Sequence, residues 1–237
     1  MALPMNSTPV YNLDIPSTGK QIKFRPFLIK EEKSLLVAQQ SEDASVMVDT
    51  LKEVVRSCVK DDIDVNNLAT FDLEYIFTQI RAKSVGEIVD LYLKCDTCED
   101  EKAVAKVSID ITGITVVKSP EHKNNIPLFD DVGIIMKYPT IEVIKRMESL
   151  NNSDMEDVFE VIVDCIDSVY DSDQVYQAKE QSKQELMDFL NNLTSDQFAE
   201  VQKFFETMPK LTEKVSYNCP VCGKEHNKVL EGLSSFF

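Results

Sequence analysis

Two Cys-x-x-Cys pairs set the strongest constraint on how this chain can fold. One occupies residues 95–98 and the other residues 219–222. Each pair lies in a predicted turn between two strand-like segments, which is how the two knuckles of a zinc ribbon present their thiolates. If all four sulfurs bind one metal ion, the 120 residues from 99 to 218 form an inserted subdomain whose ends return to one place. The candidate metal ligands are Cys95, Cys98, Cys219 and Cys222.

The second pair matches a zinc knuckle better than the first. Pro220 bends the chain inside this pair, and Gly223 directly after it lets the backbone fold over, so amide N–H groups can point at the sulfurs. The first pair has neither residue and is followed by Glu99, so it matches less closely. His226, four residues after Cys222, could replace one thiolate as a ligand, but we expect it on the surface of the returning strand.

Three interpretations of these cysteines are open, and we favour the first. The four thiolates bind one structural zinc ion tetrahedrally; or the thiols stay reduced, with no site or a partial one; or they carry out redox or disulfide chemistry. Redox chemistry fits least, because a thioredoxin-like pair lies at a helix N-terminus, whereas residues 223–225 lead into another strand-like run. Cys58 and Cys165 fall on apolar stripes of predicted helices, and we expect both in the core.

The chain is strongly acidic, and this narrows the class of partner. It has 25 Lys and Arg against 41 Asp and Glu, a formal net charge of −16, which repels phosphate backbones and anionic lipids. We therefore expect protein partners and no nucleic acid. The six glycines form no cluster that could cradle a phosphate, and the two histidines leave little for acid–base catalysis. We expect no small-molecule substrate and no enzyme activity, with His122 on a polar surface loop.

The N-terminus and the longest apolar runs bear on where the protein works. The first residues contain no basic stretch before an apolar one, and no apolar run approaches the roughly 18–20 residues of a membrane span. We expect no membrane span and a protein of the reducing cytoplasm, where paired cysteines favour metal over disulfide.

Hydrophobic periodicity predicts an α+β fold in three parts. Residues 1–86 form an N-terminal hairpin from strands at 10–15 and 21–25, followed by helices at 29–40, from 43, and at 70–84. Residues 87–139 with 210–237 form a β-rich module with the zinc-ribbon-like knuckles, with strands at 87–94, 103–110, 114–118, 125–129 and 133–138. Residues 140–209 form an acidic helical subdomain inserted between the two cysteine pairs, with helix starts at Ser153, Ser182 and Thr194.

Most of the net charge belongs to this insertion. Residues 151–208 hold 14 acidic and three basic residues, a net charge of −11. A helix predicted over residues 153–170 carries its acids opposite its apolar stripe. A row of acids on a helix is more often a solvated face, and a docking face for a basic partner is the alternative. The candidate partner-binding acids are Asp157, Glu160, Asp164 and Asp167.

Two phenylalanines, Phe236 and Phe237, end the sequence. They either pack onto the chain's own core, which we slightly favour, or form an anchor for a pocket on a partner. Both alternatives fit a protein that works in an assembly.

Several segments, in this order, resemble the baseplate hub assembly proteins of T-even-type, contractile-tail bacteriophages. They are residues 11–27 with Pro-Ser-Thr-Gly at 16–19 and Lys-Phe-Arg-Pro-Phe at 23–27, residues 30–33, 80–87, 131–134 and 136–139, the second cysteine pair, and residues 232–237. The resemblance implies a non-enzymatic late phage protein that helps to build the baseplate hub, as a hub component or a chaperone-like assembly factor. It implies hub or tail proteins as partners, the host cytoplasm during assembly, and a place in the tail baseplate of the virion.

A zinc-ribbon regulator that contacts nucleic acid or polymerase is the alternative. It needs a basic or aromatic groove near the knuckles. Lysines do surround the cysteines, but acids are interleaved with them and the chain has no Trp, so the charge argument favours the assembly protein. The lysines concerned are Lys94, Lys102, Lys106, Lys214, Lys224 and Lys228.

Overall fold

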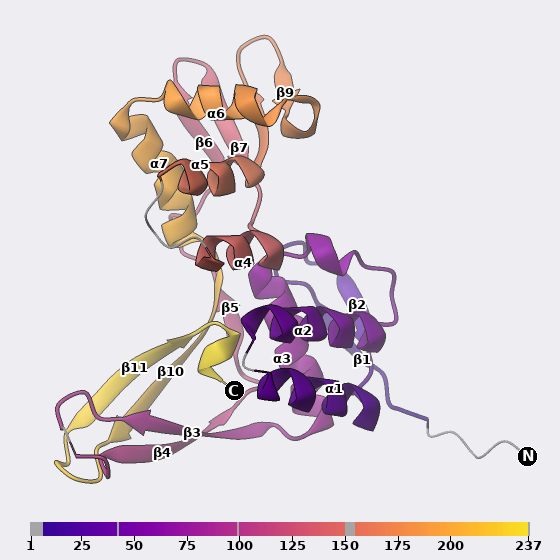
Figure 1. Ribbon diagram of the computed structural model, residues 1–237, viewed down its shortest axis with the longest axis vertical. Coiled ribbons are helices and arrows are strands. Elements are labelled where there is room, and N and C mark those ends of the chain that lie inside the picture. The colour runs from indigo at the N-terminus through magenta and orange to yellow at the C-terminus, as the bar shows by residue number, and fades with distance from the viewer. Residues whose placement is uncertain (1–6, 42, 99, 150–154, 237) are drawn as a thin grey trace, which may run out of the picture. The chain divides into compact units, whose positions relative to one another are not determined.

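The computed structural model describes residues 7–41, 43–98, 100–149 and 155–236 (Figure 1). Helices and strands both occur, as an α+β fold requires. The chain divides into two compact units. Unit 1 comprises residues 1–65, 71–117 and 210–237, and unit 2 comprises residues 66–70 and 118–209.

Unit 1 begins with the predicted hairpin and three helices. Strands β1 (Tyr11–Asp14) and β2 (Gln21–Phe24) pair antiparallel, and helices α1 (Ile29–Gln40), α2 (Ala44–Cys58) and α3 (Thr70–Ser84) follow. The Glu31 side chain reaches back to accept the Leu28 N–H at 2.8 Å, and the Asp43 carboxylate accepts the Ser45 N–H at 2.8 Å. Each bond satisfies a backbone donor that has no partner inside the helix, which explains why the helices begin there.

The strands of unit 1 form two further sheets. β3 (Ile88–Lys94) pairs with β4 (Val104–Asp110) as a hairpin. β10 (Lys210–Asn218) lies between β11 (Glu225–Glu231) and β5 (Thr115–Val117), antiparallel to both. Val117 is paired with Lys210, so the segment between them leaves unit 1 and returns to it on adjacent strands.

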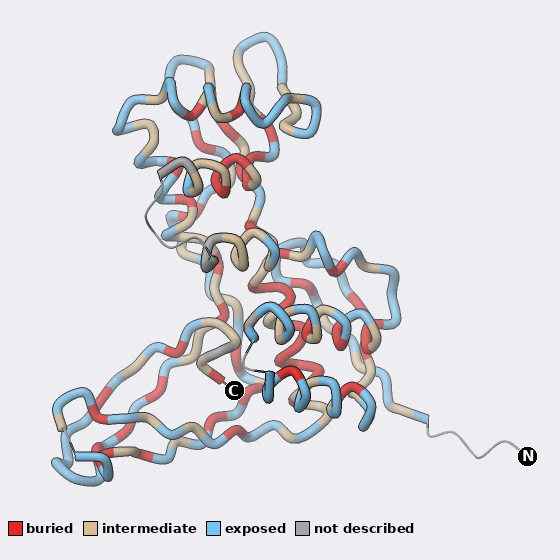
Figure 2. Tube along the Cα trace, in the orientation of Figure 1, coloured by how far each residue is buried: buried red, intermediate tan, exposed pale blue. Residues whose placement is uncertain are grey.

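The core of unit 1 joins the helices to the strands. Figure 2 shows buried stretches along α3 and along the strands. One cluster of buried side chains contains Ala82, Val89, Ile109, Ile111, Ile114, Leu211, Val215, Leu230 and Phe236. Ala82 comes from α3 and Phe236 from the C-terminal end, and the other members come from the strands and the segment after β4. This cluster therefore packs α3 and the C-terminal end against the strands of unit 1. Cys58 is fully buried at the end of α2, as predicted.

Unit 2 combines a four-stranded antiparallel sheet with helices. The sheet order is β6 (Asn125–Phe129), β7 (Val132–Met136), β8 (Ile166–Tyr170) and β9 (Val175–Gln177). Its helices are α4 (Ile141–Ser149), α5 (Met155–Asp164), α6 (Lys183–Asn191) and α7 (Ser195–Thr207), with a short 3₁₀ turn η2 (Ala178–Glu180) before α6. A second 3₁₀ turn, η1 (Val65–Asn67), contains the boundary between the units and precedes α3. Capping boxes at Ser182 and Thr194 confirm two predicted helix starts. The third, Ser153, lies outside the described residues.

The predicted helix over residues 153–170 is wrong in its second half. Helix α5 ends at Asp164, and residues 166–170 form β8. Apolar residues three or four apart suggested a continued helix, but in the structure residues 166–168 alternate between buried and exposed, and Val169 pairs with Ile134 on β7. Long-range pairing to β7 therefore decided the structure of this segment. Cys165, predicted in the core on a helix, is buried where α5 gives way to β8.

The units also differ from the three predicted parts. Residues 1–65 share a unit with the cysteine-bearing hairpins, and strands β6 and β7 belong with the inserted helices. The insertion is therefore α and β rather than helical. The physical reason is that Ile126, Ile134 and Met136 from these strands share one core with Leu190 and Phe204 from the helices.

His122 also differs from its prediction, because it is buried rather than on a surface loop. It stacks on Tyr138, with ring centroids 5.5 Å apart, and lies beside Phe204 at 5.0 Å. Its Nδ1 is 3.0 Å from the Thr207 hydroxyl, and burial lowers the pKa of the imidazole. These contacts give the side chain a place in the core of unit 2.

The burial of Phe236 allows a test of the C-terminal packing. Phe236→Ala removes a side chain with 0% exposure and should lower the free energy of unfolding by about 3–5 kcal/mol. Val10→Ala, at a position 51% exposed in the same unit, should change it by less than about 0.5 kcal/mol. Urea denaturation of both variants measures the difference, and equal small effects would contradict the packing.

Candidate functional site

The two cysteine pairs meet at the ends of the β3–β4 and β10–β11 hairpins. The four Sγ atoms all lie within 4.8 Å of one another. Cys95 Sγ is 3.9 Å from Cys222 Sγ, and Cys98 Sγ is 3.9 Å from Cys219 Sγ. All four cysteines are free, and these separations are far longer than a disulfide bond of about 2.0 Å. The structure thus brings the four predicted ligands together.

The second knuckle has the geometry expected from its sequence. Gly223 has φ +71°, a left-handed conformation that side chains disfavour, and its N–H donates to the Cys219 carbonyl at 2.9 Å. The N–H groups of Val221 and Cys222 then point at Cys219 Sγ, at 3.4 and 3.5 Å. The turn thus aims two backbone donors at this sulfur, which fixes its orientation in the cluster.

The first knuckle reaches a similar result without proline or glycine. The Cys95 N–H donates to the Ala103 carbonyl at 2.8 Å and closes the turn. The N–H of Thr97 lies 3.4 Å from Cys95 Sγ, and its hydroxyl oxygen lies 3.1 Å from the same sulfur. The sequence did not lead us to predict this role of Thr97; the feature that could have indicated it is a hydroxyl side chain two residues after a cysteine.

The hydrogen bonds of this cluster shift the pKa values of its thiols. Donation from Thr97 lowers the pKa of Cys95 to about 5, and the backbone N–H of Lys224 lowers that of Cys222. Cys98 is shifted upward, to about 12, because its thiol hydrogen-bonds to Cys222. A cation that binds these sulfurs would displace the protons that remain on the thiols.

The sulfur positions fit a tetrahedral metal ion. With Zn–S bonds of about 2.3 Å, the edges of a tetrahedron of thiolates are about 3.8 Å long. The two separations of 3.9 Å match this edge, and the remaining ones stay within 4.8 Å. The donor set, four sulfurs and no oxygen, is the one that structural zinc sites use.

His226 lies beside this cluster and is 8% exposed, so its predicted place on the strand surface is wrong. Strand register pairs His226 with Tyr217, and the two rings stack at 5.1 Å with an interplanar angle of 17°. The His226 Nε2 is 3.2 Å from Cys95 Sγ. The ring is therefore placed to donate a hydrogen bond to this thiolate rather than to replace it.

Polar contacts between protein groups hold the two hairpins together at the same end. The Tyr217 hydroxyl donates to the Lys94 carbonyl at 2.8 Å, and the Lys228 ammonium lies 2.8 Å from the Asp96 carboxylate. Lys106 pairs with Asp90 at 2.7 Å. Two of the lysines around the cysteines, Lys106 and Lys228, are thus paired with neighbouring acids, which reduces the positive charge that could attract a phosphate backbone.

The predicted partner-binding acids do not form one helical stripe. Asp157, Glu160 and Asp164 lie on α5, whereas Asp167 is exposed on β8. Glu160 pairs with Lys183 at 2.6 Å, and Asp164 pairs with Arg146. Part of this charge is therefore compensated within unit 2.

The C-terminal phenylalanines are placed only in part. Phe236 is fully buried in the core of unit 1, as in the first of the two alternatives. The preceding turn, η3 (Leu233–Ser235), is held by the Leu233 N–H, which donates to the Glu74 carboxylate at 3.1 Å. Phe237 lies outside the described residues.

Among the described residues, no helix is both long enough and apolar enough to cross a membrane.

Comparison with known proteins gives matches that span nearly the whole chain. The model of a family described as "T4 bacteriophage base plate protein" matches residues 8–237. The baseplate hub assembly protein gp26 of Enterobacteria phage T4 is 25% identical over 228 residues, which cover 96% of this chain and 97% of that protein. No solved structure matches significantly.

The left-handed turn of the second knuckle leads to a testable difference between two glycines. Gly223→Ala places a side chain at φ +71° and should lower the free energy of unfolding by about 1–2 kcal/mol. Gly113→Ala is the matched control, because its Cβ would meet its nearest neighbour, the Asp110 carbonyl oxygen, at an ordinary 3.7 Å. Chemical denaturation of both variants is the measurement, and an equal response would contradict the turn geometry.

Proposed function

Because the chain belongs to the family of T4 bacteriophage base plate proteins, we propose that it assists the assembly of the hub of a phage tail baseplate. The observation that carries this proposal is the extent of the family match, which runs through both units and includes both cysteine pairs. A relative of nearly the same length bears the name of a baseplate hub assembly protein.

In this proposal the protein works by binding other baseplate proteins and catalyses no reaction. It acts as a hub component or a chaperone-like assembly factor, in the host cytoplasm during assembly and in the tail baseplate. The net charge of −16 supports protein partners with basic surfaces over nucleic acid or anionic lipid.

We further propose that Cys95, Cys98, Cys219 and Cys222 bind one structural zinc ion. Their mutual distances, their sulfur-only donor set and the N–H groups directed at Cys219 support it. A zinc ion bound by four thiolates has no open position for water, and it would cross-link the two hairpins. Structural zinc binds small peptides with apparent free energies of about 10–16 kcal/mol, enough to hold distant segments of a chain together.

The zinc proposal predicts a metal content that depends on these cysteines. Protein purified without chelator should contain about one zinc ion per chain by mass spectrometry of the metal. Cys219→Ser should lose the zinc, whereas Cys58→Ala, at a buried cysteine outside the cluster, should keep it. A folded, fully reduced and metal-free wild-type protein would contradict the site.

The assembly role predicts physical association with baseplate proteins. Affinity purification of the tagged chain from infected cells, followed by cross-linking and mass spectrometry, should identify hub or tail proteins. Purified virions and assembly intermediates should be analysed in parallel, because a chaperone-like factor should occur only in the intermediates and a hub component in both. Absence from both, without any baseplate partner, would refute the role.

A further inference from the structure

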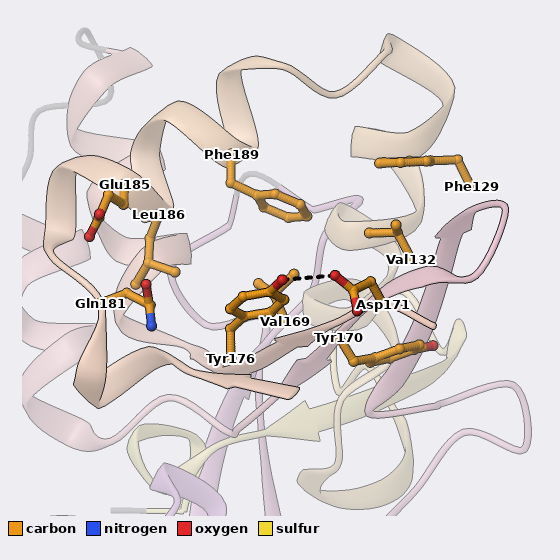
Figure 3. A pocket seen from close by; sticks show the side chains of 10 residues that line it. All are labelled: Phe129, Val132, Val169, Tyr170, Asp171, Tyr176, Gln181, Glu185, Leu186 and Phe189. Carbon is orange, nitrogen blue, oxygen red and sulfur yellow. Dashed lines mark hydrogen bonds between the residues drawn. The ribbon is translucent and has the colours of Figure 1, made fainter. Parts of the chain in front are cut away.

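We infer that a hollow on the surface of unit 2 is a docking site for a baseplate protein segment that presents a bulky apolar side chain next to lysine or arginine. Figure 3 shows this hollow, which has a volume of about 330 Å³. The inference rests on the proposed function, in that it takes the partner to be a baseplate protein.

The walls of the hollow are mostly apolar. Phe129 and Val132 flank the β6–β7 turn, Val169 and Tyr170 come from β8, and Phe189 projects into the hollow from α6 (Figure 3). Leu186 is buried, whereas Phe129 stays 42% exposed at the edge. Unit 2 thus leaves several large apolar side chains partly uncovered, and burial of this surface by a partner is favourable.

Hydrogen bonds within unit 2 shape the hollow. The Tyr176 hydroxyl donates to the Asp171 carboxylate at 2.8 Å (Figure 3). Outside this view, the Tyr170 hydroxyl donates to Asn125 at 2.8 Å. Gly133 has no side chain, and a Cβ there would collide with the Tyr170 ring. A site whose walls are already ordered loses little conformational entropy when a partner binds.

The charge around the hollow is negative. The residues that line it include the acids Asp171 and Glu185 and no lysine or arginine. Backbone N–H groups of Gln174 and Asp173 lower the pKa of Asp171, and Ser182 lowers that of Glu185, so both stay ionised at neutral pH. Exposed acids also adjoin the lining residues in sequence, at Asp130, Asp131 and Asp173.

This charge selects among possible occupants. Phosphate groups and acidic peptides would be repelled, whereas a cation beside an apolar anchor would be attracted. The volume is at the lower end of the range of about 300–1,000 Å³ for ligand pockets, and it suits one or two large side chains rather than a cofactor. An apolar anchor with basic neighbours is the chemistry that complements both properties.

A peptide titration with the full-length chain tests this inference without any phage protein. The probe is a fluorescent peptide Lys-Lys-Phe-Leu-Lys-Lys, with Glu-Glu-Phe-Leu-Glu-Glu as the charge-reversed control. Phe129→Ala should weaken binding of the basic peptide at least about tenfold, because an aromatic contact at the edge is lost. Val158→Ala is the matched control, since Val158 is equally exposed in the same unit and does not line the hollow.

Each result of the titration either supports or contradicts the docking site. Binding of the basic peptide that Phe129→Ala weakens and Val158→Ala does not supports the docking site. No binding, equal binding of the acidic peptide, or equal affinity of the two variants would overturn it. Circular dichroism of both variants confirms that the fold of unit 2 is intact.

Photocross-linking in infected cells separates this inference from the proposed function. Benzoylphenylalanine in place of Phe129 should cross-link to an apolar residue beside lysine or arginine in a baseplate protein, and the same group at position 158 should not. Co-purification of baseplate proteins without a cross-link from position 129, or with one only to a second copy of this chain, would overturn the docking site and leave the assembly role. Failure of the wild-type chain to capture any baseplate protein would count against the assembly role itself.

Discussion

The antiparallel pairing of β10 with both β5 and β11 is the constraint on which the rest of the structure depends. At one end of β10, Lys210 pairs with Val117, so the chain leaves unit 1 and returns to it on adjacent strands. At the other end, Asn218 pairs with Glu225 and directs Cys219 to the knuckle. Because side chains alternate between the faces of a strand, a shift of one residue in this register would turn the apolar face of β10 outward. A single strand therefore carries both the point at which the chain returns to unit 1 and the residues that lead into the second cysteine pair.

Hydrogen bonds and an ion pair between protein groups surround the cysteine cluster, and none of them depends on a metal. The Tyr217 hydroxyl and the Lys228 ammonium reach across from one hairpin to the other, and His226 lies beside Cys95. Such contacts around a metal site orient its ligands and restrict their motion. Because the hairpin ends contribute only a small apolar cluster, these polar contacts add to what holds them together; the cluster consists of Cys95, Ala103, Cys219 and Cys98.

Unit 2 divides its acidic residues between two kinds of role. Some carry structure: Glu185 completes a capping box, Asp171 organises the turn after β8, and Glu160 pairs with Lys183. Together with exposed acids they also give the unit a negative field, which affects partner choice and association rate more than it affects the fold. The apolar hollow lies within this field, so hydrophobic burial and charge attraction select for the same kind of partner.

Sequence alone determined the features that depend on neighbouring residues. The first hairpin, helices α1 to α3, the cysteine-bearing turns and the capping boxes at Ser182 and Thr194 all follow from local periodicity, caps and turn residues. Tertiary structure alone decided that residues 166–170 form a strand, that His226 and His122 are buried, and that β6 and β7 join the inserted unit. The reason is that local sequence does not show which distant segment a strand pairs with or which side chains will cover a residue, and both are decided only when the chain folds.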